Sequence, residues 1–191
     1  MSIQFIPVET DQQLEHLADM ASEIWHEYWP PRIGKAQTDY MVEMFHSVEA
    51  MKHDMAEHGY RYWFLVDEQG KYVGYTGGAS QHLTGDDEAD AWMKHGKVLD
   101  ERWPDRWFIS KVYLYAEERG KHYGSEVIRF YEQLCLDEGL PAMALTVNRE
   151  NELGIRAYEG NGFVSVEDVD AEIGEGFVMY DHIMVRAVPT A

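Results

Sequence analysis

The segment YLYAEERGKHYGSEVIRFYEQL (113–134) decides the fold, because an apolar strand pattern leads through a charged, glycine-bearing turn into an amphipathic helix pattern. Aromatic and β-branched residues over 107–116 are typical of a strand. After the turn, apolar residues recur at the spacing of one helix face, at Val127, Ile128, Tyr131, Leu134 and Cys135. The first N–H groups of a helix are unpaired and carry partial positive charge, so this junction predicts an anion-binding turn.

The turn itself, RGKHYGS (119–125), has local features that fit an anion. Gly120 and Gly124 allow a ligand to approach the backbone closely. Arg119 and Lys121 place two positive charges in a chain whose formal net charge is −19. Taken alone the turn is weak evidence, because many strand-to-helix connections contain glycine.

The residues on both sides of this segment predict an α/β (α+β) domain, 1–191, built on a mixed sheet. Upstream, strands are expected at 3–8 and, as a pair joined by a turn around Glu68–Gly70, within 60–80. Downstream, strands are expected at 142–148, near 163–172 and near 176–187.

Helix signals lie between these strands. Thr10 is a candidate N-cap for a first helix, and YWPPRIGK (28–35) should end it. A second helix is expected from Thr38 through Met51, and a short one over 151–162. The polar and acidic segment that runs from residue 84 to residue 106 is expected to be an excursion with one or two helical turns.

Composition limits the partners. With 16 basic and 35 acidic residues, the surface should repel nucleic acid and attract cations such as an amine substrate, although an acidic surface also serves solubility. The single cysteine excludes an internal disulfide framework and fits a reducing compartment. We expect a soluble, cytoplasmic protein, because no secretory signal and no apolar run near ~20 residues is present. No histidine pair has metal-site spacing, so no metal is expected.

Taken together, the strand at 107–116, the turn, the following helix and LTVN (145–148) resemble the GCN5-related N-acetyltransferase (GNAT) family, as do the spaced residues Asn151, Tyr158, Gly162 and Phe163. The resemblance covers about 107–163. The tail EIGEGFVMYDHIMVR (172–186) is more weakly similar to bacterial members that acetylate spermine or spermidine. One position departs from the family turn, Arg/Gln-x-x-Gly-x-Gly/Ala. His122 replaces its middle glycine, and a Cβ there would limit the approach of a phosphate.

The resemblance implies a mostly antiparallel sheet of about seven strands flanked by about four helices, splayed in a V between the fourth and fifth strands. It also implies acetyl-CoA as cofactor and a homodimer as one assembly. The pyrophosphate would take backbone N–H groups of the turn, and the pantetheine arm would pair with the preceding strand, where the Leu114 N–H would polarise the thioester. The implied cofactor-binding residues are Tyr113, Leu114, Tyr115, Arg119, Gly120, Lys121, His122, Tyr123, Gly124, Ser125, Asn148 and Asn151.

The implied catalytic residue is Tyr158, which would hydrogen-bond or protonate the coenzyme A sulfur. Full proton transfer from a phenol of pKa ~10 to a thiolate of pKa ~8.5 is uphill by ~2 kcal/mol, so a hydrogen bond or a concerted transfer is favoured. An ammonium of pKa ~10.4 must also lose a proton before it attacks. The base stays open among His82, Tyr113 and Tyr115, with Glu117 and Glu118 beside the turn expected to be solvated.

The function expected from the sequence is acetyl transfer from acetyl-CoA to a primary amine of a small molecule, with a polyamine as the first candidate. A protein N-terminus, an amino acid or an aminoglycoside are alternative acceptors. A coenzyme A sensor without catalysis is a further alternative, because of His122.

Overall fold

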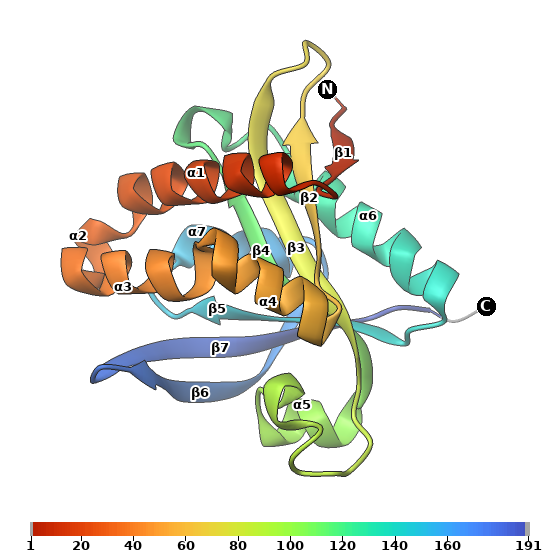
Figure 1. Cartoon of the computed structure of the whole chain (residues 1–191). Helices are drawn as coiled ribbons and strands as arrows, with labels where there is room; N and C mark the ends of the chain where they lie inside the picture. Colours follow the sequence, from red (N-terminus) through yellow and green to blue (C-terminus); the bar gives the residue numbers. More distant parts are fainter. Residues whose placement is uncertain (1, 190–191) are drawn as a thin grey trace. The chain divides into compact units, whose positions relative to one another are not determined.

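The computed structural model describes residues 2–189 and contains a seven-stranded sheet of order β1-β2-β3-β4-β5-β7-β6 (Figure 1). The pairs β1–β2, β2–β3, β5–β7 and β6–β7 are antiparallel, and β4–β5 is parallel, which confirms the predicted mixed, mostly antiparallel sheet. The strands are β1 (Gln4–Pro7), β2 (Arg61–Val66), β3 (Tyr72–His82), β4 (Asp105–Leu114), β5 (Ala142–Asn148), β6 (Val164–Gly174) and β7 (Phe177–Ala187).

Within the described residues there are seven α-helices, where about four were expected. They are α1 (Asp11–Tyr28), α2 (Pro30–Ile33), α3 (Lys35–His46), α4 (Val48–His58), α5 (Lys97–Arg102), α6 (Tyr123–Glu138) and α7 (Glu152–Gly160). Two 3₁₀ turns, η1 (Ala91–Met93) and η2 (Ala116–Glu118), complete the set. None of these helices, over residues 2–189, combines the length and the apolar character that crossing a bilayer requires.

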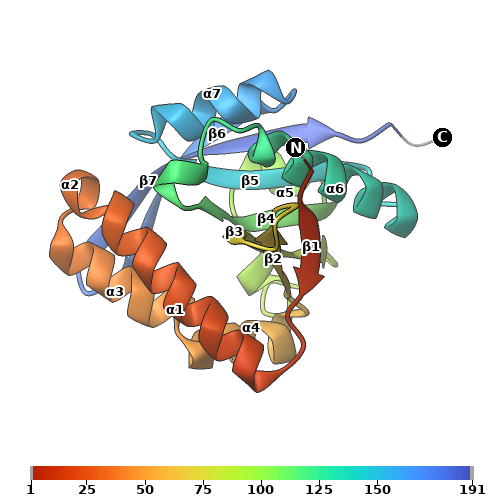
Figure 2. The same ribbon diagram turned by 90° about the horizontal axis from the view of Figure 1, so that it is seen from above.

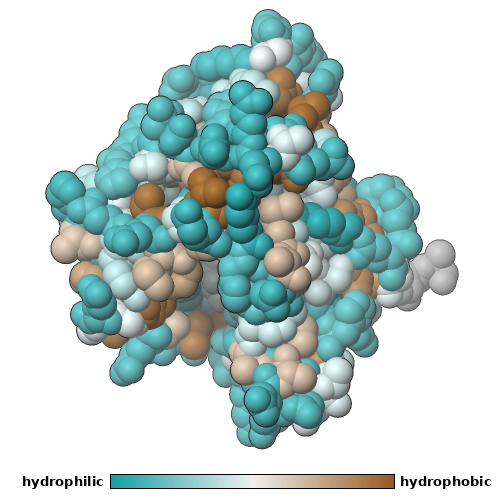
Figure 3. Space-filling model, in the orientation of Figure 1, coloured by the Kyte–Doolittle hydropathy of each residue, from teal (hydrophilic) through white to brown (hydrophobic). Residues whose placement is uncertain are grey.

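The chain forms two compact units, each made from two separate stretches. The first unit comprises the residues up to Gly78 together with Lys111–Glu126. The second comprises Ala79–Ser110 and the residues from Val127 onward. Hydrophilic side chains cover most of the face seen in Figure 3, as the net charge predicts.

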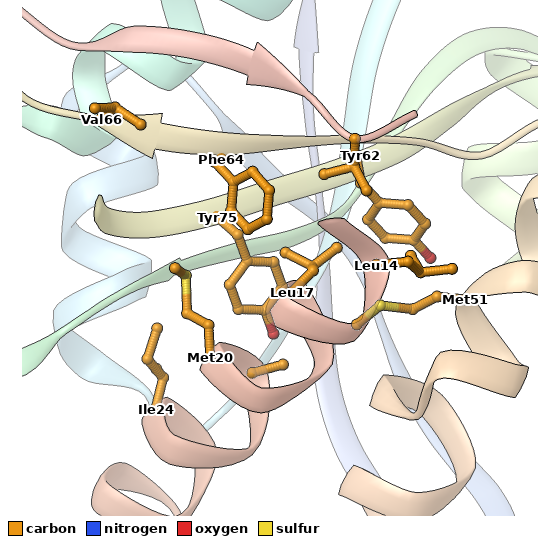
Figure 4. Close-up of a cluster of buried hydrophobic side chains, with 11 residues drawn as sticks. Leu14, Leu17, Met20, Ile24, Met51, Tyr62, Phe64, Val66 and Tyr75 are labelled. Atoms are coloured by element: carbon orange, nitrogen blue, oxygen red, sulfur yellow. The ribbon is translucent and has the colours of Figure 1, made fainter. Parts of the chain in front are cut away.

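In the first unit, α1 begins where the sequence predicts. Gln13 N donates to Thr10 Oγ1 at 3.2 Å and Thr10 N donates to Gln13 Oε1 at 3.0 Å, so the two residues form a capping box. The apolar face of α1 packs on β2 and β3, and α1 lies beside α3 and α4 (Figure 2). The buried core of this unit (Figure 4) consists of Val8, Leu14, Leu17, Met20, Ala21, Ile24, Met51, Tyr62, Phe64, Val66 and Tyr75.

The predicted single helix over 38–51 is wrong, because Ser47 divides it into α3 and α4. Ser47 has extended backbone angles (φ −73°, ψ 161°), and its hydroxyl accepts from Ala50 N at 3.2 Å. A serine side chain that caps a helix start competes with the continuous helical ladder. The predicted break over 28–35 is confirmed, although Pro30 and Pro31 begin the short α2, since proline is compatible with a first helical turn.

In the second unit, β5 pairs with β7 along its whole length, and β6 and β7 form a hairpin (Figure 1). The described parallel register of β4 with β5 comprises Trp107–Met143 and Phe108–Ala144. One face of this part of the sheet forms a second core, made of Leu99, Phe108, Ala142, Ala144, Ile183 and Val185.

A fully buried arginine holds the 84–106 excursion in the second unit. Arg106 Nε donates to Gln81 Oε1 at 2.8 Å, and Nη2 donates to Met93 O at 2.6 Å and to Asp100 Oδ1 at 2.9 Å. Buried charges persist only where they are paired and hydrogen-bonded, and Arg106 meets that condition. The excursion is therefore anchored from inside, which its polar composition did not predict.

Candidate functional site

The candidate site in the first unit begins at the end of β4. Tyr115 N donates to Val73 O of β3 at 3.1 Å. Because successive N–H groups of a strand point to opposite edges, the Leu114 N–H is directed away from β3. The two strands approach closely at Gly74, where an added Cβ would lie 2.1 Å from Tyr113 O. The predicted thioester-polarising donor is thus not engaged with β3.

At the turn, five consecutive backbone amides are available to a ligand. Across the described part of the chain, no hydrogen-bond acceptor is found for the N–H groups of residues 120–124. The next two amides, of Ser125 and Glu126, donate to His122 O at 3.1 and 3.3 Å and begin α6. A cluster of unpaired amides at the start of a helix is a site for phosphate or carboxylate.

His122 adopts the backbone conformation that a glycine would serve. Its φ is 66°, and Gly120 also has a positive φ of 76°. Histidine tolerates this left-handed region better than β-branched residues do, at a cost of about 1–2 kcal/mol. The imidazole is exposed. The sequence departure from the family motif therefore leaves the backbone of the turn in a glycine-like shape.

The two basic residues of the turn both have protein partners. Lys121 Nζ donates to Glu118 Oε2 at 2.8 Å, and Lys71 Nζ donates to Glu118 Oε1 at 2.6 Å. Arg119 donates to Leu114 O through Nη2 at 3.1 Å, and its guanidinium lies 4.4 Å from the centre of the Tyr28 ring. An anion at the turn would have to share Lys121 with Glu118 and Arg119 with the Leu114 carbonyl.

The candidate bases near the turn are poorly suited to accept a proton. Lys121 and Lys71 hold the pKa of the buried Glu118 carboxyl below its usual value. A hydrogen bond from its own backbone N–H, and then one from Lys71, lower the pKa of Glu117. Burial, and the hydrogen bond to Glu23, raise the pKa of Tyr115, whose hydroxyl already donates to Glu23 Oε2 at 2.8 Å.

The remaining candidates differ in their surroundings. The Tyr113 ring packs on Trp25, His46 and Tyr75, with centroid distances of 5.4, 5.7 and 5.3 Å. In the second unit His82, whose side chain is exposed, has Nδ1 at 2.9 Å from Asp105 Oδ1. Glu118 was expected to be solvated but is 3% exposed, because the two lysines compensate its charge.

In the second unit, Asn151 caps α7 and Tyr158 lies on the same helix. Asn151 Oδ1 accepts from Gly154 N at 3.1 Å. The ring of Tyr158 packs edge-on against Phe163 at 5.7 Å, and Gly162 ends the helix with φ 85°, as predicted. Burial raises the pKa of Tyr158 to about 12. Its hydroxyl has no hydrogen-bond partner among the described residues.

Asp181 is a feature of this unit that the sequence interpretation missed. It is 9% exposed, lies opposite Asn148 in the β5–β7 register and has a side-chain hydrogen bond with Thr146. Its Oδ1 is buried without a partner among the described residues. Burial raises the pKa of Asp181 to about 6. The signal was present in VMYDHIMVR (178–186), where an acid shares the face of Ile183, two residues on, which lies in the core.

The sequence pattern of the acetyltransferase (GNAT) family matches residues 18–163. The chain therefore belongs to this family, which confirms the resemblance drawn from the strand–turn–helix segment. Family members are N-acetyltransferases that use acetyl-CoA, and the unpaired amides at residues 120–124 fit the pyrophosphate of that cofactor. Over residues 2–189, no group of three or more His, Cys, Asp or Glu side chains is placed to hold a metal ion.

Solved structures share the fold at low sequence identity. The PaiA N-acetyltransferase of Thermoplasma acidophilum, in complex with coenzyme A, is 18% identical (TM-score 0.67; 98% of this chain and 99% of that chain). The spermidine N-acetyltransferase of Vibrio cholerae, in complex with CoA and spermine, is 15% identical (TM-score 0.62; 97% and 95%). A GCN5-related N-acetyltransferase of Rhodopseudomonas palustris is 13% identical (TM-score 0.69; 98% and 96%). A comparison with curated protein sequences gave no significant match.

Proposed function

We propose that this acetyltransferase transfers the acetyl group of acetyl-CoA to a primary amine of a small molecule, and that a polyamine is its first candidate acceptor. The observation that carries the proposal is the run of unpaired amides at residues 120–124, at the start of α6 and directly after β4. Acetyl-CoA supplies the acetyl group as a thioester.

The turn would bind the pyrophosphate through these amides, to which the α6 dipole adds. Lys121 and Arg119 contribute positive charge, but each is shared with a protein oxygen. Backbone donors therefore account for most of the anion binding, and the two cations adjust its strength. Tyr123 acts through its backbone N–H in this proposal. The Ser125 N–H already donates to His122 O, so Ser125 would contribute its side-chain hydroxyl.

The edge of β4 that is directed away from β3 would hold the pantetheine arm between Tyr113 and Tyr115, by the hydrogen bonding of an added strand. The Leu114 N–H, directed away from β3, would donate to the thioester carbonyl and stabilise the negative charge that develops there. The Leu114 carbonyl already accepts from Arg119, so it is not required for this pairing.

Tyr158 would hydrogen-bond the coenzyme A sulfur as the thiolate leaves. With a pKa of about 12, complete proton transfer to a thiolate of pKa ~8.5 would be uphill by ~5 kcal/mol, so Tyr158 stabilises the leaving group as a hydrogen-bond donor. Asn148 and Asn151 are proposed to contact the pantetheine region. Asn151 also orders the start of α7, and through it Tyr158.

An amine acceptor is supported by the charge of the chain, −19, which attracts cations. A polyamine is supported by the tail resemblance and by the Vibrio cholerae spermidine enzyme among the structural neighbours. Peptide N-termini, amino acids and aminoglycosides are the competing acceptors. The sensor alternative rested on His122, and the glycine-like backbone there weakens its basis. A cytoplasmic location, supported by the single cysteine, and a homodimer complete the proposal.

The test is a thiol-release assay with acetyl-CoA and a panel of spermidine, spermine, amino acids, an aminoglycoside and peptides, combined with calorimetric titration of coenzyme A. We expect coenzyme A binding and turnover with at least one small amine. Binding without turnover on any amine would favour a sensor. Turnover only with peptides would exclude a polyamine as the acceptor. Absence of coenzyme A binding would refute the assignment of the turn as the pyrophosphate site.

A further inference from the structure

Resting on the proposed function, we propose that Asp181 is the general base that takes the proton from the acceptor ammonium. The assignment comes from the buried position of its carboxylate, from its unpartnered Oδ1 and from the lowered pKa values of Glu117 and Glu118, the acids beside the turn. The proposal makes Asp181 a catalytic residue, in contact with the nitrogen that reacts.

The geometry of β7 singles out this carboxylate. Asp181 lies on the strand face that Ile183 and Val185 use for the core, so its side chain enters an apolar environment. The Asp181 carboxylate has a side-chain hydrogen bond with Thr146, while its Oδ1 is buried and lacks a donor among the described residues. An unpaired buried carboxylate oxygen costs stability, and such groups in native proteins mark strained sites, catalytic roles or places where a water, an ion or a ligand completes the pairing. An ammonium is the complementary ligand.

The charged groups around Asp181 do not neutralise it. Burial has the largest effect on the pKa of Asp181, while the nearby Arg149 and His182 act in the opposite direction and favour its ionised form. They are engaged by β6: Arg149 Nη2 donates to Asp170 Oδ1 at 2.8 Å, and His182 Nδ1 lies 2.7 Å from Asp168 Oδ1. The helix α5 packs on β6, and its charged side chains have other partners. Lys97 pairs with Glu101, Asp100 pairs with Arg106, and Arg102 lies over the Trp103 ring.

The raised pKa makes proton transfer less unfavourable. An amine of pKa ~10.4 loses its proton to an ordinary aspartate of pKa ~3.9 with an equilibrium constant of about 10⁻⁶·⁵. With the pKa of Asp181 at about 6, the constant becomes about 10⁻⁴·⁴, a gain of roughly a hundredfold. The carboxylate is still ionised at neutral pH, so it is ready to accept the proton.

The proton balance is complete without another reactant. One ammonium proton moves to the Asp181 carboxylate, and the freed lone pair forms the C–N bond while the C–S bond of the thioester breaks. The second nitrogen proton goes to the departing sulfur, to which Tyr158 donates a hydrogen bond. Asp181 then releases its proton to water, so the products are the acetylated amine, the thiol and one proton.

The experiment compares wild type, Asp181→Asn and Glu172→Gln, an exposed carboxylate on the same hairpin, in pH profiles of kcat/KM. We expect Asp181→Asn to lower kcat/KM by about 10²–10⁴-fold at pH 7, as removal of a general base does. The kcat/KM of Asp181→Asn should then rise tenfold per pH unit toward pH 9, because the amine must lose its proton in solution before it binds. The acid limb near pH 6 should disappear in Asp181→Asn and persist in Glu172→Gln. Coenzyme A affinity should stay within about threefold, which shows that the variant is folded.

The outcomes separate the two proposals. If wild type acetylates an amine and Asp181→Asn keeps kcat/KM within threefold, or keeps the acid limb near pH 6, the inference about Asp181 is refuted and the proposed function stands. If wild type binds coenzyme A but acetylates no amine, the proposed function fails, and the inference with it. Should Asp181→Asn not fold, Asp181→Ser, which reduces side-chain volume and keeps a polar group beside Thr146, takes its place with the same criteria.

Discussion

Gly74 offers a sharp test of how closely β3 and β4 approach beside the candidate cofactor site. In Gly74→Ala the new Cβ would lie 2.1 Å from Tyr113 O and 3.0 Å from Leu114 Cα. Real Cβ contacts are essentially never shorter than 3.0 Å, so the backbone must move by about 3.0 − 2.1 = 0.9 Å. Such overpacking typically costs about 1–3 kcal/mol. For a chain of this length, that corresponds to a fall in Tm of about 2–12 °C.

Gly124→Ala is the matched control in the same unit. Its added Cβ meets nothing within 4 Å, its φ is not positive, and the family motif allows alanine at this position. Alanine is favoured over glycine in helices by up to about 1 kcal/mol, so Tm should stay the same or rise. Thermal unfolding followed by circular dichroism measures both variants, and calorimetry measures coenzyme A affinity.

Gly74→Ala should also weaken coenzyme A binding at least tenfold, because residues 113–115 shift with the strand. A Tm within 1 °C of wild type for Gly74→Ala would show that β3 and β4 are not packed as closely as described, and the reasoning would fail. An equal fall in Tm and in coenzyme A affinity for Gly74→Ala and Gly124→Ala would also contradict the reasoning.

Four further predictions follow from the same structure. Tyr158→Phe should lower kcat at least tenfold and leave the coenzyme A Kd within about threefold, as single-turnover kinetics and calorimetry would show; an unchanged kcat removes its role. Arg106→Met should lower the free energy of unfolding in urea by about 3–5 kcal/mol, because it leaves Asp100 and Gln81 without their partner; a loss under 1 kcal/mol would contradict this. His122→Gly should retain coenzyme A binding, whereas His122→Val should lose about 1–2 kcal/mol of stability at its positive φ; the reverse order would show that the turn is not strained. For Asp181, the folded pKa of about 6 exceeds the unfolded value of ~3.9. Its contribution to the free energy of unfolding is therefore fully present below pH ~4, and about 3 kcal/mol of it is lost as pH rises through 6. Asp181→Asn should remove that pH dependence in urea titrations at pH 4 and pH 8, and an unchanged dependence would locate it elsewhere.

The sequence by itself determined the elements whose signals are local. The strand–turn–helix at 107–138, the capping box at Thr10 and the helix end at Gly162 depend on residues a few positions apart, so their patterns were sufficient. The unpaired amides of His122, Tyr123 and Gly124 follow from the same local rule, because every helix start leaves such groups, whereas those of Gly120 and Lys121 belong to the preceding turn.

Tertiary structure decided what depends on distant neighbours. Ser47 divides a helix although its apolar pattern continues, since capping depends on the backbone conformation adopted there. Arg106 and Glu118 look solvated in the sequence but are buried, because partners 25 and 47 residues away compensate their charge. The pKa of Asp181 depends on how much water the surrounding strands exclude. Desolvation is a property of the assembled surroundings, and no spacing of residue types along the chain determines it.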